Sequence, residues 1–295
     1  GGGPAGLGGP GGGGLVGRLV TRDADSEPPR DWPVAGGRTE CCGPTQFTGL
    51  SDRLYRNLGD GRFEDISRSS GIAAFADAGL GVVCLDFNGD GRLDLYVAND
   101  ADPNHLWINQ GNGRLVNDAI LVGLAYNRYG VAEGGMGTVA ADADGDWDVD
   151  VFVSHLIQET NTYYQNRGAA GFNDATAKSG LGLPSISYTG FGVAFVDLDN
   201  DSDLDLVVVN GAVKRRPSSL RPADDGFWSF YGEPNLIFDN LGQGRFADLG
   251  TALPGWSSVV EVSRGLIAAD FDRDGDLDLL VTQMEGPVRL WRNDG

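Results

Sequence analysis

The chain has 295 residues, enough for a large hydrophobic core, and a formal net charge of −20. Only two of its residues are lysines, and a surface this acidic argues against nucleic acid as a partner, because phosphate contacts need clustered Lys and Arg. No apolar run reaches the roughly 18 residues of a membrane span, so no membrane-spanning segment is expected.

Residues 1–40 are rich in Gly and Pro and predict an irregular segment, the remnant of an earlier repeat, ahead of a repeat domain at residues 41–295. The first twenty residues show neither the charged start nor the apolar centre of a secretory signal. Cys41 and Cys42 fall in a predicted loop, and their pairing is left open. Cys84 lies in a predicted strand, where we expect a buried small apolar residue.

One nine-residue loop pattern occurs four times, with oxygen-bearing side chains at positions 1, 3, 5 and 9 of every copy. Ca²⁺ takes six to eight oxygen ligands, chiefly carboxylates, carbonyls and water. We therefore predict about four calcium sites, in which the residue at position 7 adds its backbone carbonyl. The predicted metal-binding residues are Asp86, Asn88, Asp90, Arg92 and Asp94 in the first loop, Asp142, Asp144, Asp146, Asp148 and Asp150 in the second, Asp197, Asp199, Asp201, Asp203 and Asp205 in the third, and Asp270, Asp272, Asp274, Asp276 and Asp278 in the fourth.

The calcium loop of EF-hands begins in the same way, but this chain departs from it. An EF-hand needs a Glu at loop position 12 and a helix after the loop. Here every position 12 is a valine, and the residues that leave each loop alternate between apolar and polar with period two. Period two predicts a strand, so each loop is expected to open a β-strand.

Two further patterns complete the repeat. A sequence of the type Asn-x-Gly-x-Gly, as at residues 57–61 and 240–244, predicts two strands joined by a tight turn. A Gly five residues before the first Asp of each loop marks a short strand that runs into the loop. One unit thus has four antiparallel strands, and successive loops start 56, 55 and 73 residues apart. The fold class predicted is all-β, a β-propeller of four-stranded blades with four to five blades present.

The third unit is longer than the others by about 20 residues, all of them within residues 211–233. This insertion collects basic and aromatic residues in an otherwise acidic chain, and Arg and aromatic residues are enriched at binding hot spots. We predict that it contacts a partner; the alternative is that its aromatic residues only cap the blade edge. The predicted partner-binding residues are Arg215, Arg216, Arg221, Phe227, Trp228, Phe230 and Tyr231.

With these motifs, and with short sequences such as Cys42-Gly43-Pro44 and Asn99-Asp100, residues 41–295 resemble the FG-GAP/VCBS-repeat propellers, which are related to the head of integrin α subunits. The chain resembles the cartilage acidic protein family more closely, whose members often carry an ASPIC/UnbV domain. The resemblance implies that the loop aspartates bind Ca²⁺ and that the chain is part of a seven-bladed propeller. Position 6, usually Gly, is Trp147 or Ser202 in two loops, where we expect weaker or rearranged sites.

We expect a secreted or cell-surface calcium-binding module for interaction or adhesion, with an unidentified protein or glycan ligand and with structural Ca²⁺. Cages made of oxygen alone suit the millimolar calcium of the cell exterior. The alternative left open is an enzyme on the same scaffold, a polysaccharide lyase or sugar dehydratase, which needs a general base. The two histidines, His105 and His155, are expected at strand ends in ordinary roles, so we predict no catalytic residue. We also expect the blades to form an open arc.

Overall fold

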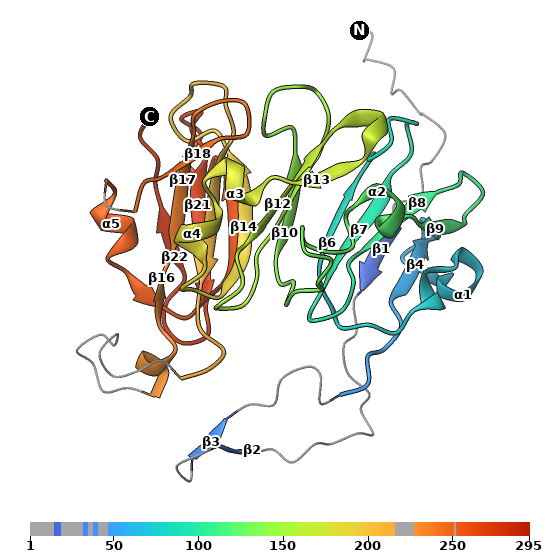
Figure 1. Cartoon of the computed structure of the whole chain (residues 1–295), viewed down its shortest axis with the longest axis horizontal. Coiled ribbons are helices and arrows are strands. Elements are labelled where there is room, and N and C mark those ends of the chain that lie inside the picture. The colour runs from blue at the N-terminus through green and yellow to red at the C-terminus, as the bar shows by residue number, and fades with distance from the viewer. Residues whose placement is uncertain (1–14, 19–31, 35–37, 41–46, 216–226, 251) are drawn as a thin grey trace, which may run out of the picture.

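The computed structural model describes residues 15–18, 32–34, 38–40, 47–215, 227–250 and 252–295. Five antiparallel β-sheets follow one another in a row (Figure 1). The helices of the described residues are single turns of three or four residues. None of them is long and apolar enough to cross a membrane. The architecture is therefore carried by the sheets alone.

The three central sheets have four strands each, joined in chain order. The second sheet of the row contains β6 (Gly79–Leu85), β7 (Asp94–Asn99), β8 (His105–Asn109) and β9 (Leu115–Asn117). The third contains β10 (Thr138–Ala141), β11 (Asp150–Val153), β12 (Thr162–Asn166) and β13 (Phe172–Asp174). The fourth contains β14 (Gly190–Val196), β15 (Asp205–Asn210), β17 (Leu236–Asn240) and β18 (Phe246–Asp248). This arrangement confirms the predicted all-β propeller of four-stranded blades.

The two end sheets have three strands each among the described residues. The first sheet contains β1 (Leu15–Arg18), β4 (Arg53–Asn57) and β5 (Phe63–Asp65), and the last contains β20 (Ser263–Ala269), β21 (Asp278–Gln283) and β22 (Arg289–Trp291). The sequence predicted only the outer two strands of the first sheet, but β1 adds a third by pairing with β4. In the segment expected to be irregular, β2 (Trp32–Val34) and β3 (Arg38–Glu40) also pair as antiparallel strands.

Short elements fill the connections between strands. Two two-residue strands pair with each other: β16 (Glu233–Pro234), just before β17 of the fourth sheet, and β19 (Val260–Glu261), just before β20 of the last sheet. The helical turns are α1 (Ser67–Ser70), η2 (Ile72–Ala74), α2 (Ala119–Val122), η3 (Gly168–Ala170), α3 (Thr176–Ser179), α4 (Gly182–Ser185), η5 (Phe227–Phe230) and α5 (Pro254–Ser257).

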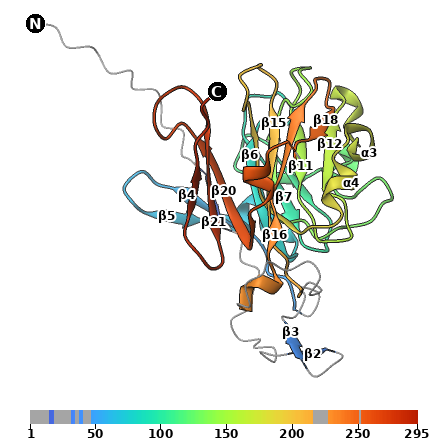
Figure 2. The ribbon, with the colours of Figure 1, turned by 90° about the vertical axis from the view of Figure 1, so that its left-hand side faces the viewer.

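Neighbouring sheets pack through their first strands, with β6 against β10, β10 against β14 and β14 against β20. In Figure 1 the first and last sheets stand at opposite ends of the row. In Figure 2 strands of both end sheets lie to the left of the central sheets, so the row curves. The described residues thus form an open arc, as expected, while the total of seven blades stays a prediction.

The core lies between the sheets, because alternate residues of each strand face opposite neighbours. Each third strand carries two adjacent apolar residues that divide in this way. Leu106 packs with Val151 of the following sheet, whereas Trp107 packs with Leu54 of the preceding sheet. The same division holds for Tyr163 and Tyr164. A central blade therefore buries both faces only when a blade stands on either side of it.

The predicted burial of Cys84 is wrong, since this residue is exposed. It lies on β6, the first strand of its sheet, whose residues after Gly79 alternate between exposed and half-buried. In the preceding sheet, β4 carries the apolar pair Leu54-Tyr55 that marks the third strand of a blade. Because β1 pairs with β4 on the side away from β5, it occupies the position of the second strand. No described strand occupies the first-strand place opposite Cys84, and the thiol is left uncovered.

Candidate metal sites

Each nine-residue loop joins the first two strands of its blade, and its first aspartate closes the loop. In the second loop one carboxylate oxygen of Asp142 accepts the backbone N–H groups of Gly145 and Asp146, at 2.9 and 3.1 Å. The other oxygen accepts the N–H of Trp147 at 2.9 Å. The loops starting at Asp86 and Asp270 close in the same way, so the curl follows from a short acidic side chain placed before polar residues.

Position 6 of every loop has a left-handed backbone, whether or not it is a glycine. The φ angle is 80° at Gly91 and 106° at Gly275, and it is 73° at Trp147 and 77° at Ser202. A residue with a Cβ pays on the order of 1–2 kcal/mol for this conformation. The two departures expected to rearrange the loops thus keep the turn, and Trp147 does so with 92% of its surface exposed.

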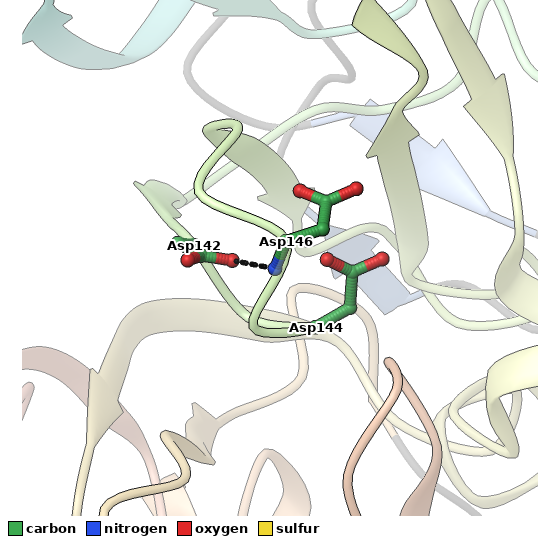
Figure 3. Close-up of side chains that lie close together, drawn as sticks. All are labelled: Asp142, Asp144 and Asp146. Atoms are coloured by element: carbon green, nitrogen blue, oxygen red, sulfur yellow. Dashed lines mark hydrogen bonds between the residues drawn. The ribbon is translucent and has the colours of Figure 1, made fainter.

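Three of the loops bring carboxylate oxygens together closely enough for a metal ion. Three aspartates in each of these loops offer oxygens within 4.8 Å of one another. Figure 3 shows Asp142, Asp144 and Asp146 around the curl of the second loop. Among the described residues the groups are Asp142, Asp144 and Asp146; Asp197, Asp199 and Asp201; and Asp270, Asp272 and Asp278.

The first loop differs from the other three. Its position 3 is Asn88, which brings no charge, and the guanidinium of Arg92 is paired with the carboxylate of Asp90. The same guanidinium donates to the backbone carbonyl of Asn109 at 2.7 Å. Three carboxylates are therefore not gathered here, and a cation has to displace Arg92 from Asp90 to use that oxygen.

The electrostatics of the loops fit a bound cation. Burial raises the pKa of Asp150 to about 7 and that of Asp205 to about 6, and it also raises the pKa of Asp94. Burial and the neighbouring Asp146 raise the pKa of Asp144. When carboxyl groups are buried and close together, burial and mutual repulsion destabilise their ionised forms unless a positive charge lies between them. An all-oxygen, anionic donor set of this kind suits a hard divalent ion such as Ca²⁺.

The aspartate at position 9 also has a structural task that the sequence analysis only partly anticipated. It is buried in all four loops, from 0% exposed at Asp94 and Asp150 to 4% at Asp205. One oxygen of Asp150 accepts the N–H of Ala143 at 3.2 Å, within the loop, and the other accepts the N–H of Asn166 at 2.8 Å, at the end of the third strand. The same two bonds occur at Asp94, Asp205 and Asp278.

The asparagine that opens each Gly-rich turn completes this connection. The side chain of Asn240 donates to the backbone carbonyl of Leu204 in its own loop at 2.8 Å, and to that of Ala143 in the loop of the preceding blade at 2.9 Å. Asn293 likewise donates to Leu198 of the preceding blade at 2.8 Å. The sequence showed these asparagines as turn markers, and only the strand register places them against the loops.

The described part of the insertion forms a compact group of rings around one cation. Arg215 stands over the rings of Phe227 and Phe230, with distances of 5.4 and 5.0 Å to the ring centres, and Trp228 and Tyr231 lie 5.9 Å apart. Phe227 is 56% exposed. Two predicted partner-binding residues, Arg216 and Arg221, lie outside the described residues.

Both histidines lie at strand ends, as expected, and both are buried. His105 begins β8 and its Nε2 lies 2.9 Å from a carboxylate oxygen of Asp77. His155 follows β11, is 1% exposed, and lies 3.8 Å from Glu133. Burial lowers the pKa of His155 to about 4, which keeps this ring neutral at physiological pH.

Comparison with known proteins agrees with this architecture. The family model described as FG-GAP-like repeat matches residues 45–97, 86–153 and 142–208, which together span more than half of the chain. Cartilage acidic protein 1 of Xenopus tropicalis is 28% identical over 251 residues, and that of Homo sapiens is 28% identical over 253 residues. Each alignment covers 79% of this chain and 34% of the relative, so the chain spans about a third of the length of these curated relatives.

Among solved structures, one described as a lectin of Agrocybe aegerita that recognises non-reducing terminal N-acetylglucosamine has a TM-score of 0.40 and 14% sequence identity. The match covers 84% of this chain and 77% of that chain. The repeated loops, the four-stranded sheets and the family match over more than half of the residues lead to one conclusion. The chain belongs to the family of FG-GAP-like repeat proteins.

Proposed function

We propose that this chain is a calcium-binding interaction module of the cell exterior, in which the metal is structural. The observation that carries the proposal is the gathering of three aspartate carboxylates within 4.8 Å in each of three loops. The name of the curated relatives, cartilage acidic protein, agrees with an extracellular setting. No metal chemistry on a substrate is needed to explain the loops.

The residues that would hold Ca²⁺ are those at positions 1, 3, 5 and 9 of each loop, with the position 7 carbonyl. Asp144 and Asp146 supply carboxylates from the curl, and Asp150 supplies one from the start of β11. Bound Ca²⁺ would supply positive charge that offsets the repulsion among these groups. The first loop offers fewer carboxylates, so its site is the weakest of the four.

The metal sites predict a pH dependence of calcium stabilisation. The raised pKa of Asp150, about 7, means that the metal-free folded protein binds a proton there which the unfolded chain, with an ordinary Asp, does not bind. That proton stabilises the metal-free form below this pKa, and the stabilisation is lost as pH rises through it. Ca²⁺ must displace the proton. Raising pH from one unit below to one unit above the pKa should therefore increase the calcium-induced stabilisation by about 1.4 kcal/mol.

Thermal melts with millimolar Ca²⁺ and with excess chelator, at each pH, measure this difference. Because the histidines titrate in both sets of melts, their contribution cancels in the comparison. A calcium-induced shift in melting temperature that is equal at the two pH values would contradict the assignment of Asp150 as a ligand.

The insertion is the proposed contact with a partner. Its exposed Phe227 and the Arg215 guanidinium over that ring place an aromatic surface beside a positive charge in an acidic protein. Deleting residues 214–230 should abolish capture by a glycan or protein array while the melting temperature changes little. Leu183→Ala, at a residue that is 85% exposed on α4, serves as the control. Unfolding or aggregation of the shortened chain would instead mean that the rings only seal the blade edge.

A further inference from the structure

A pocket with a volume of about 290 Å³ lies where the connection after the second sheet meets the third sheet. One wall is formed by α2 and the residues that follow it, as far as Arg128, and the other by Phe172, Asn173 and Asp174 of β13. The two sheets have four strands each, so the pocket does not depend on where the chain begins or ends. Its volume is close to the lower limit of the usual range for ligand sites, about 300–1,000 Å³, and suits a small ligand.

The connection that forms the first wall carries extra residues. Fourteen positions separate Gly123, which ends α2, from Gly137 before β10, whereas the matching glycines are ten positions apart before β6 and twelve before β14. The extra length forms a turn that Asn127 closes, since its side-chain oxygen accepts the N–H groups of Tyr129 at 3.0 Å and Val131 at 3.1 Å. This turn forms one edge of the pocket.

Two contacts hold the walls of the pocket close together. The backbone N–H of Arg128 donates to a carboxylate oxygen of Asp174 at 2.8 Å. Gly123 has a φ of 86°, and a Cβ there would lie 2.6 Å from the carbonyl oxygen of Phe172. A side chain at position 123 would push the walls apart, so only a glycine allows this approach.

The pocket combines aromatic rings with polar groups. Tyr126 and Phe172 are half-buried, and both pack against the core cluster between the second and third sheets. Asn173 is exposed, and its side-chain amide has no hydrogen-bond partner among the described residues. The carboxylate of Asp174 accepts one N–H at each oxygen, from Arg128 and Thr176, and each oxygen keeps a lone pair for a ligand.

The charges at the pocket favour a neutral ligand. The guanidinium of Arg128 lies over the ring of Tyr129, 5.4 Å from its centre, and forms no ion pair within the described part of the chain. It repels a cationic ligand, and the carboxylate of Asp174 repels an anionic one. The hydroxyl groups of a neutral ligand can accept from the guanidinium and donate to the carboxylate, while its C–H groups pack on the aromatic rings.

We propose that this pocket binds one neutral sugar ring of a glycan. Hydroxyl groups of the sugar bond to Arg128, Asn173 and Asp174, and one face of its ring packs on Tyr126 and Phe172. This inference rests on the proposed function as an interaction module, for which it names a class of ligand. None of the residues of the pocket belongs to the insertion or to a metal loop. One ring bound in this way has an expected Kd of about 1 mM, which is too weak for capture on an array.

Saturation-transfer NMR in solution, with Ca²⁺ present, tests the pocket with the methyl glycosides of glucose, galactose, mannose and N-acetylglucosamine. At least one of them should receive saturation, strongest at the C–H protons of the ring face that packs on the aromatic rings. Arg128→Ala and Asn173→Ala should each weaken this binding about tenfold or more, because each removes hydrogen bonds to the sugar. Both residues are exposed, so the melting temperature should change little.

Arg245→Ala, at an exposed arginine in the turn before β18, should leave sugar binding unchanged and controls for the loss of a charge. Absence of saturation transfer to all four glycosides would overturn the proposal, and so would unaltered binding by both pocket variants. Stronger binding of glucuronic acid than of every neutral glycoside would overturn the neutral class.

The chain that lacks residues 214–230 should still bind the sugar. If only this deletion abolishes sugar binding, the interaction module stands but the pocket is not its site. If the sugar binds at the pocket while the deletion leaves capture on the arrays intact, the pocket stands and the insertion is not the partner contact. The two proposals can therefore fail separately.

Discussion

Removal of Ca²⁺ with a chelator should lower the melting temperature on the order of 10 °C. At roughly 1 mM Ca²⁺ and a Kd of about 0.1 mM, one site adds about 1.4 kcal/mol to the stability of the folded state. Four such sites add about 5–6 kcal/mol, which is comparable with the whole stability of a domain. Each kcal/mol is worth about 2 °C in a chain of this size.

Calorimetric melts of the chelated protein, before and after millimolar Ca²⁺ is restored, measure this effect, and titration calorimetry gives the number of ions bound. Mg²⁺ at the same concentration is the matched control, since it prefers a rigid octahedral shell and retains its water. An unchanged melting temperature on adding Ca²⁺ would refute structural calcium. A stoichiometry of three would identify the first loop, with its Arg92–Asp90 pair, as empty.

The substitution Asp150→Ala should be the most damaging single change in the second loop. It removes the acceptor for the N–H groups of Ala143 and Asn166 and for the hydroxyl of Tyr163, which lies 2.6 Å away. Leaving a buried donor unpaired costs about 1–3 kcal/mol. We therefore expect a loss of at least about 3 kcal/mol without metal, and the loss of one calcium site as well.

Asp148→Ala is the matched control in the same loop. Position 7 is expected to use its backbone carbonyl, so removal of its side chain should spare both the site and the fold. Urea unfolding with and without Ca²⁺ measures the two variants. Equal stability of Asp150→Ala and Asp148→Ala would mean that position 9 neither anchors the loop nor binds the metal.

The sequence was sufficient to predict the repeat, the strands and the loops, because these depend on local spacing. The alternation of apolar and polar residues after Leu93 predicts a strand whatever the tertiary context. An Asp at every second residue predicts a tightly curved loop. The link from Asp94 to Asn109 could not be predicted, since it depends on how β7 and β8 align. The exposure of Cys84 could not be predicted for a related reason. It depends on whether the first sheet has a strand that packs against β6.

The ion pair between Arg92 and Asp90 in the first loop could not be predicted from the sequence either. Arg92 was expected to offer a carbonyl, and nothing in its spacing showed that its guanidinium would contact Asp90. Ser202 and Trp147 were expected to disturb their loops, but the hydrogen bonds from their N–H groups to the first aspartate hold the left-handed turn. In each case a side-chain contact determines the conformation of the loop, and this contact cannot be predicted from residue types and spacing alone.

The double donation by Asn240 has a consequence for how the loops respond to occupancy. The amide of Asn240 donates to Leu204 and to Ala143. The amide of Asn293 donates to Leu198, and its backbone N–H donates to Asp278, so hydrogen bonds link three successive loops along one rim. If the loops bind Ca²⁺ as proposed, we expect binding along the rim to be cooperative, because each occupied loop leaves its neighbour less conformational freedom to lose.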